Sequence, residues 1–455
     1  MQRKMYMALI FVSVLMTLQA ARLDPDKQSK NEIFTMTNTQ VAQKTLSPYT
    51  GVTEHKSNPD TLKGKVMTGY QGWFTTPGDG SGMEWFHWGL PTSSPSKDFR
   101  PGRCSIDLWP DMSEYPQSSK VATEFKHKDG STAYVFSSND PDAVNLHFRW
   151  MNEYGIDGAF VQRFAAQTFK NYEYHNVNNV LSNCRAAANR NGRAYALMYD
   201  LSGLQEGQIE NVIKDIIILR EKMKLACDPA DRAYLHHKGK PVIAVWGIGF
   251  KNRGYTLNEC RRLVDFLKND KEYGGFTVML GVPTFWRTLE NDSVEEEQFH
   301  EIIKMADIIS PWMVGRYGRI EDVDSFCKPL WMKDIQWCRE NAKDYMPVLF
   351  PGFSWYNLQG EKFDHIKRQK GKFLWKQYYT AVECGAEMIY QAMFDEVDEA
   401  TAIFKCTNNP PVGGKSKFLT YEGLPSDHYL WLVGQGGKML RQEIPLSETI
   451  PERDN

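Results

Sequence analysis

The chain has 455 residues, of which 54 are Lys or Arg and 56 are Asp or Glu, so its formal net charge is −2 at pH 7. A chain this close to neutral has no excess of positive charge to attract nucleic acid or an anionic membrane, and neither is expected as a partner. Hydrophobic residues make up 42% and charged residues 24% of the chain, a composition typical of a globular protein and not of a disordered one.

The first 20 residues have the layout of a secretory signal peptide. Arg3 and Lys4 precede the apolar run 8–16, and Ala20 and Ala21 follow it as a cleavage region. That run is about half of the roughly 20 residues that a membrane-spanning helix needs, and no later run is apolar enough, so we expect export without membrane insertion. Residues 21–60 are polar and lack periodicity, which predicts a flexible leader.

Eight cysteines follow the expected cleavage site, and none lies in a CxxC pair or near a histidine at metal-ligand spacing. In an oxidising compartment some of them are expected to form disulfides. Asn291-Asp292-Ser293 is a sequon for N-glycosylation. No GxSxG or HExxH motif occurs, and His236-His237 precedes a predicted strand, so we expect that pair to be structural or solvated and expect no cofactor or metal.

Runs of apolar, β-branched or aromatic residues predict eight buried strands, which cover residues 66–74, 156–164, 194–199, 241–250, 276–285, 308–314, 346–353 and 387–394. Stretches with helical spacing lie between most of them, at residues 209–223, 257–267, 297–305, 330–341 and 373–384. A last helix is expected just after Asp427.

Strands that are apolar on both faces and alternate with helices indicate a parallel sheet covered by helices. No glycine-rich phosphate loop follows the first strand, as an open doubly wound sheet would require. The sequence therefore predicts the α/β class and a single (β/α)₈ TIM-type barrel with long strand-end loops. We place this barrel at residues 61–442 and a frayed tail at 443–455.

In a barrel of this kind the active site lies at the C-terminal mouths of the strands. Aromatic and a few polar side chains follow most of the runs, and such a mixture suits the apolar faces and hydroxyl groups of a sugar ring. We therefore expect an oligosaccharide or polysaccharide as partner. The candidate substrate-binding residues are Tyr70, Trp73, His87, Trp88, Arg163, Asp200, Trp246, Trp286, Trp312, Arg316, Trp355 and Asp395.

Four carboxylates follow the eighth run, in the segment Asp395-Glu396-Val397-Asp398-Glu399. Cleavage of a glycosidic bond needs two carboxyl groups, and Glu396 and Glu399 are the candidate catalytic pair, with Asp395 and Asp398 as substitutes. A calcium site built from the same acids is an alternative, although the ligand spacing of an EF-hand is absent. A second alternative is a lectin-like barrel that binds carbohydrate without turnover.

Several short motifs give the chain a family resemblance. They are Gly69-Tyr70-Gln71-Gly72-Trp73-Phe74, His87-Trp88, Asp107-Leu108-Trp109-Pro110, His147 ahead of Tyr154-Gly155-Ile156-Asp157-Gly158, Pro351-Gly352-Phe353-Ser354-Trp355 and Glu396-Val397-Asp398-Glu399. From about residue 66 to residue 405 the chain resembles the glycoside hydrolase family 71/99-like proteins, which include the endo-α-1,2-mannosidases.

The resemblance implies a barrel enzyme that hydrolyses an α-linked glycosidic bond. By motif position, Glu396 would be the base acting on the substrate's own 2-hydroxyl, and Glu399 the general acid and base at the leaving oxygen. For these roles the pKa of Glu399 should be raised while Glu396 stays ionised. The mannosidase motif resembles Trp-Asn-Glu-Trp-His-Glu, and this chain departs from it at the positions flanking both glutamates, so mannose is not implied.

Overall fold

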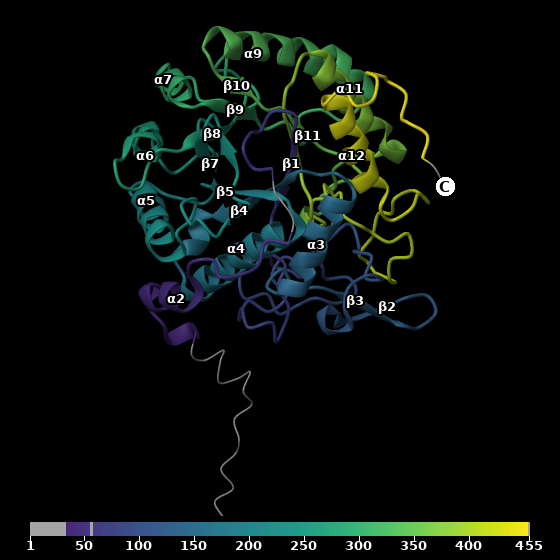
Figure 1. Cartoon of the computed structure of the whole chain (residues 1–455). Coiled ribbons are helices and arrows are strands. Elements are labelled where there is room, and N and C mark those ends of the chain that lie inside the picture. The colour runs from purple at the N-terminus through teal and green to yellow at the C-terminus, as the bar shows by residue number, and fades with distance from the viewer. Residues whose placement is uncertain (1–32, 55–57, 454–455) are drawn as a thin grey trace, which may run out of the picture.

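The computed structural model describes residues 33–54 and 58–453. Its main sheet is parallel and is surrounded by helices, which Figure 1 shows as a ring around the strands. The parallel strands are β1 (Val66–Tyr70), β4 (Gly158–Phe164), β5 (Ala194–Asp200), β7 (Lys240–Trp246), β8 (Thr277–Val282), β9 (Ile308–Pro311), β10 (Asp344–Tyr345), β11 (Val348–Leu349) and β12 (Ile389–Gln391).

The sheet curls back on itself. Its order is β10-β9-β8-β7-β5-β4-β1-β12-β11, and its two ends, β10 and β11, follow one another along the chain. The Met346 amide donates to the Ile309 carbonyl of β9 (2.9 Å), and the Pro347 carbonyl accepts from the Tyr390 amide of β12 (3.0 Å). Residues 344–349 thus act as one strand, interrupted where Pro347 has no amide hydrogen to donate. The predicted (β/α)₈ barrel is confirmed.

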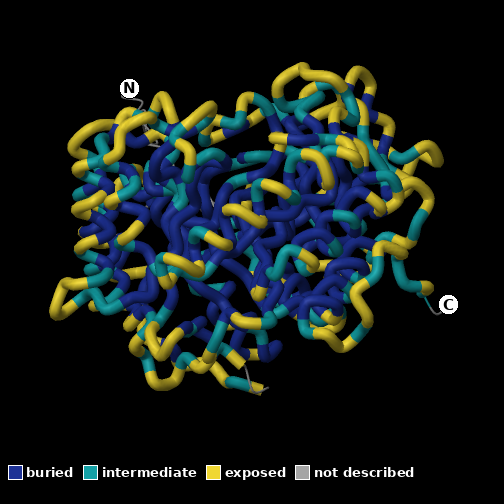
Figure 2. The backbone as a smooth tube through the Cα atoms, turned by 90° about the horizontal axis from the view of Figure 1, so that it is seen from above, coloured by how far each residue is buried: buried dark blue, intermediate teal, exposed yellow. Residues whose placement is uncertain are grey.

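The helices lie close to where the sequence places them. The expected helix 209–223 is α5 (Ile209–Ile218) continued by the π-helical η3 (Leu219–Met223), and the others are α6 (Leu257–Asn269), α7 (Gln298–Met305), α9 (Lys328–Glu340), α11 (Lys372–Glu383) and α12 (His428–Leu440). Not predicted were α3 (Pro141–Glu153), α4 (Asn171–Asn191), α8 (Ile320–Asp322) and α10 (Tyr356–Gln359). Seen from above in Figure 2, buried backbone fills the centre and exposed backbone the periphery.

The connection from β1 to β4 is the longest strand-end loop. It contains the antiparallel hairpin of β2 (Val121–Lys126) and β3 (Thr132–Val135), followed by α3. The predicted first strand extends to residue 74, but β1 ends at Tyr70 because the chain turns at Gly72, whose φ is +62°. A Cβ at Gly72 would lie 2.5 Å from Val180 Cγ1 of α4, so the turn requires glycine.

The expected leader and tail contain ordered structure where they are described. Residues 38–45 form α2 (Asn38–Thr45), whose N-terminus is closed by a capping box between Thr37 and Gln40 and whose Val41 is buried. A helix this short, with a single buried stripe, does not show a helical period in the sequence. The expected signal peptide lies outside the described residues. In the tail, Arg453 pairs with Asp427 (2.7 Å).

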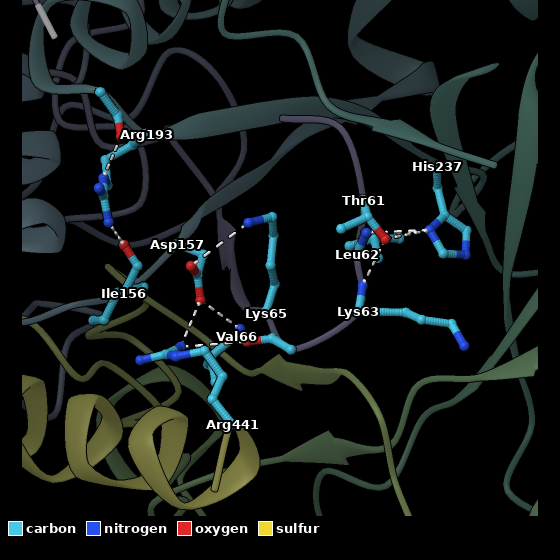
Figure 3. A network of polar contacts seen from close by, with 12 residues as sticks. Thr61, Leu62, Lys63, Lys65, Val66, Ile156, Asp157, Arg193, His237 and Arg441 are labelled. Atoms are coloured by element: carbon cyan, nitrogen blue, oxygen red, sulfur yellow. Dashed lines mark hydrogen bonds and ion pairs between the residues drawn. The ribbon is translucent and has the colours of Figure 1, made fainter. Parts of the chain in front are cut away.

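A polar network closes the N-terminal end of the barrel, opposite the strand mouths (Figure 3). Asp157 accepts a hydrogen bond from the Val66 amide (2.9 Å) and lies 3.5 Å from Arg441 and 3.8 Å from Lys65. His237 lies in β6 (His236–His237), which pairs antiparallel with β7 at this end of the barrel. It accepts from the Leu62 amide through Nδ1 (3.1 Å), and its Nε2 lies 2.8 Å from Asp344. His237 is buried and structural, as the sequence predicts.

All eight cysteines lie in the described part of the chain, and each is a free thiol. The expected disulfides are therefore not formed. Six of the thiols are buried, Cys384 is half-buried and Cys227 is exposed. Buried cysteines of this kind act as small hydrophobic side chains in the core. Among the described residues, no helix is long and apolar enough to cross a membrane.

Candidate active site

The acid cluster lies at the mouth of the barrel, where β12 and β1 end side by side. Asp395 is fully buried, and its two carboxylate oxygens accept hydrogen bonds from the backbone amides of Gln71 (2.8 Å) and Gly72 (2.9 Å). Burial raises the pKa of Asp395 to about 7, and the two amide donors oppose that rise. Asp395 therefore ties the ends of the two strands together, which corrects its expected role in substrate binding.

Glu396 is buried beside Asp395 and is held from both sides. Its Oε1 accepts from the side-chain amide of Gln71, and its Oε2 accepts from the Thr401 hydroxyl (2.5 Å). Burial, followed by the negative charges of Glu399 and Asp398, raises its pKa well above the ordinary value. The expectation that the environment favours an ionised Glu396 is wrong in this respect, because the sequence does not show how completely the loop is buried.

Glu399 is half-buried and is the most accessible carboxyl of the cluster. Its backbone carbonyl accepts from the Ser354 amide (2.9 Å), which joins the acid loop to the loop after β11. Burial, then the charge of Asp398, raises the pKa of Glu399 to about 8. The Trp355 indole opposes part of that rise, although its N–H makes no hydrogen bond of normal geometry. The raised pKa of Glu399 agrees with the sequence expectation.

Asp398 lies between the two glutamates in the chain and is bonded to a histidine from the β1–β4 connection. Its Oδ2 is 2.7 Å from His87 Nδ1, while its Oδ1 is buried without a partner among the described residues. The His87 ring stacks on the Trp73 indole, with centroids 3.7 Å apart and planes 4° apart. The pair fixes the Asp398 carboxylate, and hence its negative charge, beside Glu399.

Asp107 is a second carboxylate that acts through backbone amides. Its two oxygens accept from the amides of Tyr356 (2.9 Å) and Asn357 (2.8 Å), directly after Trp355. Its own amide donates to the Val397 carbonyl (2.9 Å), in the middle of the acid loop. Burial raises the pKa of Asp107 to about 6. Asp107 thereby sets the position of Trp355 relative to the acid loop.

Aromatic rings continue from the acid cluster along the barrel mouth. Tyr390 of β12 lies near Glu396, whose charge contributes to raising the tyrosine pKa, and its hydroxyl accepts from the Gln162 side chain (2.9 Å). The Trp312 ring lies 6.3 Å from the Tyr390 ring, and the Trp246 ring lies 5.7 Å from Trp312. Both tryptophans are half-buried, so they leave ring surface facing the mouth.

Asp200 is half-buried at the end of β5 and accepts from the Ser202 amide (2.7 Å). Burial raises its pKa, and its charge contributes to the raised pKa of Glu399, so the two lie within electrostatic range. Together with Trp73, His87, Trp246, Trp312 and Trp355, Asp200 belongs to the expected substrate-binding residues that lie around the mouth. Arg316 is exposed and paired with Asp292 (3.0 Å), away from these contacts.

Four expected substrate-binding residues are core residues instead. Tyr70 bonds to His147 (2.8 Å), and Trp88 donates to the Phe136 carbonyl (3.2 Å), both with no exposed surface. Arg163 is bonded to Asp215 on α5, because on β4 its neighbour Gln162 points inward and successive side chains alternate. The last of the four is Trp286, buried against Trp337 of α9.

Sequence reasoning missed the roles of Gln71, Thr401, Asp107 and Tyr390. Gln71 and Asp107 stand in the motifs quoted above, but a motif does not show which atom a side chain meets. Thr401 and Tyr390 gave no signal beyond their nearness to the acid cluster. Among the described residues, no group of three His, Cys, Asp or Glu side chains is placed to hold a metal ion, so the calcium alternative has no geometric support there.

Comparison with known proteins supports the fold. No model of a known protein family matches this chain. No curated protein matches it by sequence. Among solved structures, the GH99 endo-α-mannosidase from Bacteroides thetaiotaomicron matches with a TM-score of 0.60 and 18% identity, over 84% of this chain and 99% of that one.

The same mannosidase in complex with bis-tris-propane matches with a TM-score of 0.58 and 16% identity over the same shares of the two chains. At this level of identity the likeness concerns the fold. The predicted resemblance is confirmed in that sense: this chain has a glycoside hydrolase-like barrel whose solved structural neighbours include a GH99 endo-α-mannosidase.

Proposed function

We propose that the protein is a secreted glycoside hydrolase that cleaves an α-linked bond in an extracellular glycan, with Glu396 and Glu399 as its catalytic residues. The observation that carries this proposal is the pair itself, two carboxyls with raised pKa at the mouth of a glycoside hydrolase-like barrel, flanked by accessible aromatic rings. Such perturbed pairs are how carboxyl groups divide acid and base roles near neutral pH.

Glu399 is assigned as the general acid. With its pKa at about 8 it carries a proton near neutral pH, and it is the more accessible member of the pair. This proton passes to the leaving oxygen as the bond between that oxygen and the anomeric carbon breaks. Burial and the negative charge of Asp398, which His87 holds in place, raise the pKa of Glu399, so that its carboxyl stays protonated near neutral pH.

Glu396 is assigned as the base. Two carboxyls that interact this strongly titrate as a pair, and after the first proton leaves they share the one that remains. Gln71 and Thr401 both donate to Glu396, and hydrogen bonds of this kind favour the charged form, whereas among the described residues Glu399 has no donor of normal geometry. The remaining proton is therefore best placed on Glu399, which leaves Glu396 to take the proton of the substrate's own 2-hydroxyl while that oxygen bonds to the anomeric carbon. Water then adds to the anomeric carbon, gives up a proton to Glu399, and the 2-hydroxyl re-forms with the proton from Glu396.

The secreted location rests on the N-terminal sequence alone. Arg3, Lys4 and the apolar run 8–16 support it, and they lie outside the described residues. The sequon Asn291 is exposed on the loop after β8, where an enzyme of the secretory pathway can reach it, so we propose it as a glycan attachment site.

Two substitutions on matched substrates test the catalytic assignment. Glu399→Gln should lose roughly 10² to 10⁴ in rate on oligosaccharides and much less on aryl glycosides, whose leaving group needs no proton. Glu396→Gln should be impaired on both. Glu387→Gln is the matched control, because Glu387 is exposed at the opposite end of the same strand and pairs with Lys63 (2.9 Å).

The substrates come from a panel of α-linked oligosaccharides and their aryl glycosides. Equal losses on both substrate types for both variants would contradict the division of roles. Full activity of either variant would move the chemistry to another carboxyl. Binding without release of product across the panel would instead favour the lectin-like alternative.

A further inference from the structure

A cavity of about 500 Å³ lies outside the barrel wall, apart from the acid cluster. It is formed between the 3₁₀ turn η2 (Ala165–Thr168) after β4, the first turn of α4 and the exposed side of α5. Its volume is in the range of small-molecule binding sites. The lining residues that matter for recognition are Phe169, Tyr174, Gln208, Asn211, Asp215 and Ile218.

The charges at the floor of this cavity compensate one another. The Asp215 carboxylate accepts two hydrogen bonds from the Arg163 guanidinium (2.6 and 2.8 Å) and a third from the Tyr199 hydroxyl (2.5 Å). Arg163 and Asp215 are both almost completely buried. This ion pair is satisfied within the protein, and the charge that remains for a ligand is that of Lys214, which is exposed and also lines the cavity.

The wall carries hydrogen-bonding groups that the protein leaves unused. The Tyr174 side chain is 98% buried, yet its hydroxyl has no hydrogen-bond partner among the described residues. Buried hydroxyls are normally satisfied, so this one indicates a missing partner in the cavity. The Asn211 side chain also bonds to no described residue, and Gln208 uses only its oxygen, which accepts from the Gln205 amide (2.9 Å).

We propose that this cavity binds a sugar residue. The hydroxyl of Tyr174 and the amides of Asn211 and Gln208 can donate and accept at once, as a ring of hydroxyl groups requires. The half-buried Phe169 ring and Ile218 supply apolar surface for the C–H face of the same ring.

The choice of a glycan as ligand rests on the proposed function. The cavity lies at the same end of the barrel as the mouth, because η2 follows β4, whose last residue, Phe164, stacks on Trp73 (5.1 Å). The site is separate from the acid cluster, because β4, β5 and the ion pair between Arg163 of β4 and Asp215 of α5 lie between them. It would hold a second glycan, or a distant part of the same one, while the mouth is occupied.

Calorimetric titration of the full chain with neutral trisaccharides, maltotriose and laminaritriose, tests the proposal. We expect two sites per chain in the unchanged protein. Asn211→Trp, which fills the cavity from the half-exposed side of α5, should leave one site. Tyr174→Phe should weaken the cavity site by about 2- to 10-fold, the value of one hydrogen bond. Tyr172→Phe is the matched control, since its hydroxyl bonds to the Ser94 carbonyl outside the cavity.

Trp312→Ala separates this proposal from the catalytic one, because it alters the mouth and not the cavity. If binding survives Trp312→Ala and is lost in Asn211→Trp, the cavity site stands even when no hydrolysis is found. A single site that is lost in Trp312→Ala and kept in Asn211→Trp would overturn the cavity proposal and leave the hydrolase proposal intact.

Discussion

Replacement of Asp395 by asparagine should make the protein less stable at low pH and more stable at high pH. The carboxyl group of Asp395 has a pKa of about 7 in the fold, compared with an ordinary value of 3.8. A carboxyl whose folded pKa is raised stabilises the fold below its unfolded pKa, and that contribution is lost as pH rises through the folded pKa. About 3 pKa units at 1.36 kcal/mol each correspond to about 4 kcal/mol, lost between pH 4 and pH 8.

The stability of the asparagine variant does not fall in this way as pH rises, but the substitution lowers the free energy of unfolding by a fixed amount at every pH. Its amide nitrogen cannot accept a hydrogen bond, so one of the two backbone amides of Gln71 and Gly72 is left without an acceptor, which costs about 1–3 kcal/mol. The variant should therefore be less stable than the parent by at most about 2 kcal/mol at pH 4.5, where the parent has already lost about 1 of the 4 kcal/mol. At pH 8 it should be more stable by about 1–3 kcal/mol, since about 4 kcal/mol is regained.

Urea unfolding at the two pH values, followed by tryptophan fluorescence, measures this crossover. Asp107→Asn is the matched variant, because Asp107 also accepts from two backbone amides and its pKa is about 6. For Asp107→Asn the pH-dependent part should shrink to about 3 kcal/mol and end near pH 7. A stability difference between Asp395→Asn and its parent that is the same at both pH values would refute the reasoning.

Four further outcomes are expected. Arg163→Met should destabilise the protein by about 3–5 kcal/mol in urea, because it leaves Asp215 buried and unpaired, and catalysis by the folded fraction should not change. Trp312→Ala should weaken oligosaccharide binding about 3- to 10-fold, through lost ring contact, without a change in the pH profile. A thiol titration should count eight thiols after denaturation, with Cys227 reacting first in the native protein; fewer than eight would reveal disulfides. Addition of EDTA should leave Tm unchanged, and a fall in Tm would support the alternative of a structural metal site.

The barrel could be predicted because its signals are repeated along the chain. Each buried strand is an apolar run in its own right, and each outer helix carries its own apolar stripe, so eight weak signals support one fold. The strand ends were less predictable. Pro347 interrupts the ladder, so the run 346–353 contains only the short strand β11, with β10 just ahead of it, and the run 66–74 ends early at the turn through Gly72.

The site could be predicted in position but not in detail. A residue at a strand end is placed at the rim by the topology alone, which is why the acid cluster, Trp73 and Trp246 lie there. Whether its side chain points into the barrel or out toward the helices depends on one residue of register, and Arg163 falls on the outward side where Gln162 falls inward. Tyr70, Trp88 and Trp286 are buried by loops and helices whose paths the sequence pattern does not give.

The hydrogen-bond donors around each carboxyl distinguish the roles of these acids, which the sequence alone does not. Asp395 and Asp107 each have both oxygens engaged by backbone amides, so they hold loops in place and have no free face for a substrate. Asp398 is engaged by His87 through one oxygen and acts on its neighbours through its charge. Glu399 is half-exposed, has no donor of normal geometry and has its pKa raised, so the proton available at the mouth is best assigned to Glu399.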